Sequence, residues 1–476
     1  MPETPARPVI VLELNELCPP LLDRWMVDGS LPNFKRLHDG SDVFQTQADV
    51  TEPDKLEPWI QWYSIHTGLS YDQHGVYHLT DGARAEHQDI WRAAIAAGRT
   101  ACSFASMNVR PFAAPGSLFV GDPWTENGDA HPPELNVYNR FVGHNVREYS
   151  NSDAGLTASD YAAFLRFLLT HGLSAGTAWR TVRQLADEKL RDPHLSYRRV
   201  AILDALQFDV FAHYYRVMRP HLATFFVNSV AHLQHSYWRY MEPDAFQVQP
   251  DGSERARYGD AIKFGYVAMD WLIGRVLKLA DRHGTTLVFQ TALSQQPFLK
   301  YEAKGGQRFF RLRDVQSFLR EAGVSYLDVD PTMTHQFMAT FGSDEARAEA
   351  ERRLSCFEYE DGRKLIDSPP HDTPNALYFG AQVPNSGDLE ALVTDQATGR
   401  TFPASEVVYE LDGTKSGCHH PVGALWIRRG THRKHEELVS ILDTFPTMLD
   451  LLGIADESSA RTGRSLFGPD AQRSAA

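Results

Sequence analysis

The chain has little cysteine. Four are present in 476 residues, and they are scattered with no paired spacing: Cys18, Cys102, Cys356 and Cys418. This distribution argues against a secreted, disulfide-stapled domain and predicts a protein of the reducing cytoplasm.

Long apolar runs and a basic excess are also missing. After Met1–Pro8 only four apolar residues follow, Val9–Leu12, which is too few for a signal-peptide core or a membrane span. Lys and Arg number 47 against 61 Asp and Glu, a net charge of −14, with no run of like charge. Nucleic-acid binding needs a basic face. We therefore expect neither a nucleic-acid partner nor a membrane partner.

Short apolar runs alternate with amphipathic stretches along the chain. The runs at Val9–Leu12, Leu222–Val230 and Thr285–Gln290 are typical of buried parallel strands. With a hydrophobic content of 42%, the sequence predicts one large α/β domain over residues 1–476. Residues 157–220 have a helical pattern and predict an inserted helical cap. Helices are also expected over 314–341 and 345–354, and a disordered tail over 456–476.

The segment from Glu57 to His78 contains the landmarks Thr67-Gly68 and His74-Gly75. It resembles the nucleophile segment of the alkaline phosphatase superfamily, in the branch of type I phosphodiesterases and nucleotide pyrophosphatases. The resemblance implies a three-layer α/β/α sandwich with a mostly parallel central sheet, and two divalent metals, usually zinc, at strand ends. Pro58 stands at the position of the nucleophilic Thr or Ser, so no alkoxide can form there.

Other segments resemble the metal-ligand motifs of the family, in the family's order. Glu13 stands at the position of the first-strand Asp, His235 at the His of Asp-x-x-x-His, and His419 at the last ligand position, in Gly417–Gly423. Apolar residues replace the ligands of the Ser-Asp-His-Gly motif, and Ala231 replaces another Asp. Because so many ligands are missing, we expect one divalent ion (Zn, Mn or Fe) bound by Glu13, His235 and His419, or with Glu57 in the place of Glu13, and no organic cofactor.

Two imidazoles and one carboxylate leave open positions for water or substrate. Such a centre lowers the pKa of a bound water and can hydrolyse an ester without a protein nucleophile, with Glu57 or Glu16 as the general base. The sequence therefore predicts a hydrolase or transferase acting on a phosphate-ester or glycan-linked small molecule. Each of these side chains can also be structural, as a buried histidine often is.

Aromatic and amide side chains accompany these motifs. Stacked aromatic faces and amide donors suit hydroxyl-rich ligands such as sugars. The predicted substrate-binding residues are Trp59, Gln61, Trp62, Gln234, Gln295 and Gln296. The same set supports an alternative, a catalytically inactive relative that binds a sugar-like or phosphate-bearing ligand in the same cleft. A third hypothesis, with Ser64, His66 or Thr67 as nucleophile, is weaker because no third partner that would position His66 is visible.

Overall fold

A computed structural model describes residues 7–79, 81–124, 129–148, 156–300, 302, 308–331, 336–369, 373–383, 388–411, 415–456 and 460–467. The chain divides into two compact units. Unit 1 comprises Met1–Gly143, Leu156–Phe298 and Ser416–Ala476, and unit 2 comprises His144–Gly155 and Leu299–Lys415.

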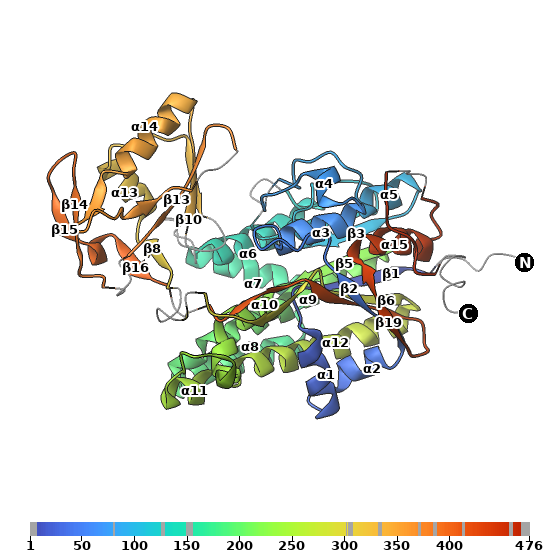
Figure 1. Ribbon diagram of the computed structural model, residues 1–476. Helices are drawn as coiled ribbons and strands as arrows, with labels where there is room; N and C mark the ends of the chain where they lie inside the picture. Colours follow the sequence, from blue (N-terminus) through green and yellow to red (C-terminus); the bar gives the residue numbers. More distant parts are fainter. Residues whose placement is uncertain are drawn as a thin grey trace, which may run out of the picture. The chain divides into compact units, whose positions relative to one another are not determined.

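Unit 1 is built on an eight-stranded sheet in the order β19-β2-β18-β6-β1-β5-β3-β4 (Figure 1). Strand β18 is antiparallel to β2 and β6, and the other pairings in this sheet are parallel. The predicted α/β class with a mostly parallel sheet is therefore confirmed. The strands are β1 (Val9–Leu14), β2 (Ser41–Gln47), β3 (Ala101–Phe104), β4 (Leu118–Val120), β5 (Leu222–Val227), β6 (Thr286–Gln290), β18 (Val422–Arg428) and β19 (Arg433–Ser440).

Helices cover both faces of this sheet and complete the three layers (Figure 1). On one face lie α3 (Pro58–Thr67), α5 (Ile90–Ala96) and α15 (Thr444–Leu452). On the other lie α2 (Pro32–His38), α9 (Val200–Met218) and α12 (Ala261–His283). The remaining helices of unit 1 are α1 (Pro19–Val27), α4 (Tyr71–His74), α7 (Ala158–Thr170), α8 (Ala175–Leu190), α10 (Ser229–Met241) and α11 (Gly252–Tyr258). Helix α6 (Asn136–Glu148) begins in unit 1, and its last residues are assigned to unit 2.

The stretch 157–220 is helical, as the sequence predicts, and contains α7, α8 and α9. Helix α9 packs against β5 and α12, so it belongs to one helical layer of the sandwich. The expectation that this stretch forms a cap stays a prediction. None of the described helices is both long and apolar enough to cross a membrane.

Unit 2 has a core of its own, centred on buried residues such as Leu312, Leu319, Phe337, Phe379 and Val393. A four-stranded sheet has the order β12-β13-β10-β9, a three-stranded sheet has the order β11-β14-β15, and β16 pairs with β8. The elements are β8 (Phe310–Leu312), α13 (Val315–Glu321), β9 (Asp328–Pro331), β10 (Gln336–Thr340), α14 (Asp344–Leu354), β11 (Phe357–Tyr359), β12 (Ile366–Asp367), β13 (Ala376–Ala381), β14 (Leu392–Asp395), β15 (Thr401–Pro403) and β16 (Val408–Glu410).

The helices expected across residues 314–341 are wrong after α13, because β9 and β10 occupy this stretch. Along β10 the side chains of Phe337 and Ala339 are buried and their neighbours are half-buried. This alternation has the period of a strand. The larger segment of unit 2, Leu299–Lys415, lies in the chain between strands β7 (Ser294–Pro297) and β17 (Gly417–His420) of unit 1.

Residues 460–467, within the expected tail, make specific contacts in unit 1. The Arg461 guanidinium donates to the Thr67 carbonyl at 2.8 Å and lies over the ring of Phe445. The backbone N–H of Leu466 donates to Thr447 Oγ1 at 3.0 Å. These residues are therefore ordered, unlike the disordered tail expected from sequence. Residues 457–459 and 468–476 of that tail lie outside the described residues.

Candidate metal centre

Glu13 points into the interior of the sandwich. In β1 the side chains of Val9 and Val11 belong to the core shared with α5 and α15. Because strand side chains alternate between faces, Glu13 shares this face with them. Its Oε1 lies 2.9 Å from His66 Nε2 of α3, and both side chains are buried. The first predicted metal ligand is thus engaged by another residue and does not lie with the two predicted histidines.

Glu16 lies two residues beyond the end of β1. Its φ of 61° is in the left-handed region, which is uncommon for a residue other than glycine. The turn is fixed by Gln234 Nε2, which donates to the Glu16 carbonyl at 2.7 Å. Asn15 Nδ2 donates to Glu16 Oε1 at 2.8 Å, and Trp62 Nε1 donates to Asn15 Oδ1 at 2.8 Å. These bonds hold the buried Glu16 carboxylate at the carboxyl end of β1.

His235 approaches Glu16 from α10, the helix that follows β5. Its Nδ1 lies 3.0 Å from the Gly417 carbonyl, which can only accept, so Nδ1 carries the hydrogen. Its Nε2 lies 3.1 Å from Glu16 Oε2. The Ser416 N–H also donates to the His235 carbonyl at 2.8 Å, which ties α10 to the segment that carries His419.

His419 completes the group from β17, which pairs with β7 in antiparallel register. Its Nε2 lies 3.6 Å from Glu16 Oε2, is buried, and has no hydrogen-bond partner among the described residues. Its Nδ1 lies 3.6 Å from Glu57 Oε2. The two imidazole rings are 5.1 Å apart at 76°.

The donor set fits one divalent ion. One ligand atom from each of Glu16, His235 and His419 lies within 4.8 Å of the others. Two ligands each bound to zinc at about 2.1 Å, at the tetrahedral angle, lie about 3.4 Å apart. The distances of 3.1 and 3.6 Å from Glu16 Oε2 fall on either side of that separation. A ligand histidine usually donates its other ring N–H to a carbonyl or carboxylate, as His235 does to Gly417.

The charge of the group suits a metal ligand better than a base. Burial raises the pKa of Glu16. The charges of His419 and His235 and the hydrogen bonds from His235 and Gln295 together lower this pKa by more than burial raises it. The net result is a fall from 4.5 to about 2. Glu16 is therefore ionised at neutral pH, and a carboxylate of such low pKa is a weak general base.

Four of the six predicted substrate-binding side chains are buried, and three of them hold Glu16 in place directly or through Asn15. Gln61 is buried and accepts from the Asp49 N–H at 2.9 Å, and Trp62 is buried against Asn15. Gln234 is buried and accepts from the Tyr266 hydroxyl at 2.6 Å. Gln295 is buried and donates to Glu16 Oε2. These four side chains are not placed to contact a ligand directly.

Two of the predicted side chains do reach the surface. Trp59 is half-buried and its Nε1 donates to the Tyr77 carbonyl at 2.8 Å. Gln296 is exposed, and its Nε2 donates to the His419 carbonyl at 3.3 Å. These two are the members of the set that have surface available for a ligand.

The hypothesis of a hydroxyl nucleophile on α3 finds no support in the geometry. The Val76 N–H donates to His74 Nδ1, so the neutral ring carries its hydrogen on Nε2, which lies 3.0 Å from Ser64 Oγ. His74 therefore donates to Ser64 and does not activate it. Thr67 Oγ1 donates to the Tyr63 carbonyl, as a structural helix hydroxyl does.

Sequence reasoning missed the part that Asn15, Asn228 and Gly417 play around the group. Asn15 Nδ2 also donates to Asn228 Oδ1 at 2.8 Å, which joins the ends of β1 and β5. A signal was present, because Asn15 and Asn228 each directly follow a buried strand. Polar residues at adjacent parallel strand ends meet at one edge of the sheet.

Comparisons with known proteins give fold-level similarities only. No family model and no curated protein matches the chain. Solved structures that are similar include phosphonoacetate hydrolase from Sinorhizobium meliloti 1021 with phosphonoformate (18% identity, 95% and 96% of the two chains, TM-score 0.40). They also include murine ectonucleotide pyrophosphatase/phosphodiesterase 5 (12%, 94% and 96%, TM-score 0.38) and a mutant of the alkaline phosphatase PafA (12%, 98% and 99%, TM-score 0.46).

At such identities and TM-scores these similarities say nothing about the activity or substrate of this chain.

Proposed function

We propose that the chain is a metal-dependent hydrolase or transferase whose centre is a single divalent ion bound by Glu16, His235 and His419. In this proposal Glu16 is the carboxylate ligand, a role expected for Glu13 from sequence. The observation that carries it is the convergence of one ionised, buried carboxylate and two imidazole Nε2 atoms. Because the Nδ1 hydrogen of His235 is fixed on the Gly417 carbonyl, loss of the Nε2 proton that faces Glu16 Oε2 would free the Nε2 lone pair for a ligand bond.

Glu57 is the residue that we propose as general base. Its Oε2 lies 3.6 Å from His419 Nδ1, and its side chain is partly exposed, so a water near the group is within its reach. A bound divalent ion would act as a Lewis acid and lower the pKa of such a water. Glu57 is the N-cap of α3 and Pro58 follows at the first helical position, where proline favours helix initiation. The role of Pro58 in starting helix α3 therefore accounts for a proline at the position where the resembled family has its nucleophile.

The substrate class that we propose is a phosphate-ester or glycan-linked small molecule. Trp59 and Gln296 offer one aromatic face and one amide at the surface of the same unit, which suits a hydroxyl-rich group. A cytoplasmic location, with neither nucleic acid nor membrane as partner, also stays a proposal. The four cysteines are free in the structure, which is compatible with a reducing compartment.

Metal analysis followed by a substrate panel tests the proposal. Protein reconstituted with zinc, manganese or iron(II) and freed of excess metal should retain about one ion per chain. Hydrolysis of aryl phosphate monoesters, aryl phosphate diesters and aryl glycosides would then be compared before and after chelation. Activity that needs the ion supports the enzyme. No bound ion, together with unchanged binding of such compounds after chelation, would instead support an inactive ligand-binding relative.

A further inference from the structure

A small cavity lies between the sheet and the helices α3 and α15, on the side toward which Glu13 points. Its polar lining comes from Glu13, His66, Gln290, Thr224 and Thr444, and the rest is apolar, including Val11, Ile65 and Met448. None of these residues belongs to the Glu16–His235–His419 group. The cavity is therefore a separate feature of unit 1.

Three side-chain atoms of this lining have no hydrogen-bond partner among the described residues. They are Glu13 Oε2, Gln290 Oε1 and His66 Nδ1. Each belongs to a side chain that is at least nine-tenths buried. A buried polar atom without a partner destabilises the folded state by about 1–3 kcal/mol. Unpaired atoms of this kind beside one cavity therefore indicate a bound group, and two of the three, Glu13 Oε2 and Gln290 Oε1, are acceptors on neighbouring strands.

The strand register brings two of these atoms together. Glu13 of β1 is the direct neighbour of Gln290 of β6 in the parallel ladder. Neighbouring strands lie about 4.8 Å apart, and paired side chains share one face. Gln290 Nε2 donates to Thr444 Oγ1 at 2.8 Å, while its other terminal atom, Oε1, has no partner among the described residues. Both Glu13 Oε2 and Gln290 Oε1 can only accept hydrogen bonds.

We propose that this cavity binds one water molecule that donates one hydrogen bond to Glu13 Oε2 and the other to Gln290 Oε1. A water has the two donors that the two oxygens require, and it fits a small site with few polar partners. A hard cation such as Mg²⁺ or Ca²⁺ would need about six oxygen ligands, whereas most of this lining is apolar. The water joins Glu13 to β6 and, through Gln290, to α15.

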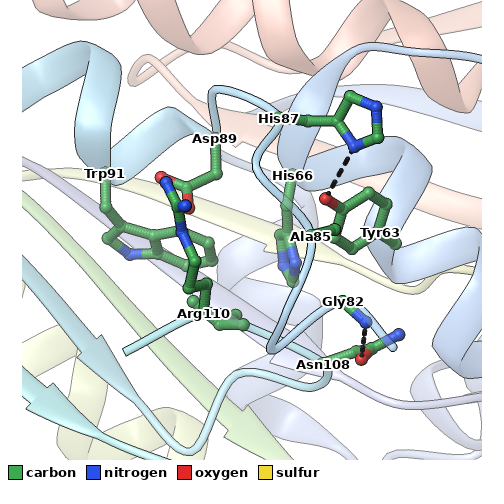
Figure 2. A pocket seen from close by; sticks show the side chains of 10 residues that line it. Tyr63, His66, Gly82, Ala85, His87, Asp89, Trp91, Asn108 and Arg110 are labelled. Carbon is green, nitrogen blue, oxygen red and sulfur yellow. Dashed lines mark hydrogen bonds between the residues drawn. The ribbon is translucent and has the colours of Figure 1, made fainter. Parts of the chain in front are cut away.

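His66 forms a wall between this cavity and a second one, shown in Figure 2. The second cavity is lined by Tyr63, Asp89, Trp91 and Arg110 in addition to His66. The imidazole of His66 therefore lines both cavities, while its Nε2 faces Glu13. The water therefore helps to hold the Glu13 carboxylate beside His66, apart from the proposed metal centre at Glu16.

High-resolution crystal structures of the wild type, Gln290→Met and Gln207→Met test the proposal. In the wild type we expect a water peak at about 2.6–3.2 Å from both Glu13 Oε2 and Gln290 Oε1. Gln290→Met removes one acceptor at similar length, and the peak should be lost. Gln207 is another buried glutamine, bonded to Tyr138 and to the Phe226 carbonyl, so Gln207→Met should keep the peak.

A wild-type cavity without a peak, in maps that show other buried waters, would overturn the proposal. A peak that persists in Gln290→Met would also overturn it. So would density that disappears when ammonium is omitted from the crystals, because the occupant is then a cation. If Gln290→Met does not fold, the wild-type maps decide alone. Metal content should be unchanged in Gln290→Met, which separates this site from the proposed metal centre.

Discussion

Two carboxylates near the end of β1, Glu13 and Glu16, lie three residues apart, and each is paired with a histidine. The two pairs differ in their access to solvent. Glu13 and His66 are joined at 2.9 Å with side chains 2% and 3% exposed. Glu16 and His235 are joined at 3.1 Å, but His235 is 22% exposed and His419 beside it is 17% exposed. The first pair is enclosed by the core, while the second is reached through its imidazoles.

The difference shows that backbone geometry, rather than residue type, assigns each pair to its surroundings. Strand alternation sends Glu13 onto the face covered by α3, α5 and α15. The left-handed turn at Glu16 ends that alternation and directs its carboxylate to the strand ends. The enclosed pair therefore contributes to the fold, and the accessible pair is the candidate for chemistry.

Removal of both imidazoles should give the largest effect. The double variant His235→Ala/His419→Ala loses two of three proposed ligands, so bound metal should fall from about one ion per chain to a small fraction. Elemental analysis of reconstituted protein measures this. His432→Ala is the control, because His432 is an exposed histidine whose Nδ1 lies near the His38 carbonyl. Retention of metal by the double variant would contradict the assignment.

Glu13→Ala should affect stability instead of metal binding. Removing one partner of a buried pair destabilises a protein by about 3–5 kcal/mol, because the other partner is left unpaired. Urea unfolding followed by tryptophan fluorescence measures the effect in unit 1, since all nine tryptophans lie there. Glu436→Ala on the exposed part of β19 should change the unfolding free energy by about 0.5 kcal/mol or less.

If Glu13→Ala removed the metal and left stability unchanged, the comparison of the two pairs would be reversed. Glu13 would then be the ligand expected from the family resemblance. Retained metal in a less stable protein keeps the two pairs distinct.

The pH dependence of stability should single out Glu16. Its pKa in the folded protein is about 2 against an ordinary value of 4.5. Because the folded value is the lower one, the ionised group stabilises the metal-free fold above about pH 4.5, and this contribution is lost as the pH falls toward 2. The difference in unfolding free energy between wild type and Glu16→Gln should therefore shrink on acidification. A difference that stays constant from about pH 7 to pH 3 would show that Glu16 is not responsible.

Much of unit 1 could be predicted from its sequence because its signals are local. The apolar runs of β1, β5 and β6 mark buried strands, and His235 and His419 follow recognisable landmarks. Glu13 was expected as a ligand because the family resemblance locates a position along the chain. Which carboxylate reaches the centre depends on the backbone angles of Glu16, which residue types do not reveal.

Unit 2 was less predictable from sequence. Strand β10 is only five residues long and β9 only four. Segments this short are not distinguished from part of a helix by their periodicity. Strand β10 pairs with β9, which precedes it directly, and with β13, some forty positions later in the chain. The contact with the distant β13 leaves no local pattern in the sequence.

The neighbouring glutamines 295 and 296 allow the finest test of the distinction between buried and accessible residues. Gln295 is buried and donates to Glu16 Oε2 and to the Ala231 carbonyl, whereas Gln296 is exposed and donates only weakly to the His419 carbonyl. Loss of a side chain that orients a metal ligand typically lowers metal affinity about 10–100-fold. We expect about tenfold for Gln295→Ala and less than about twofold for Gln296→Ala in competition with a chromogenic chelator. Equal effects would mean that the bond from Gln295 does not orient Glu16 for the metal.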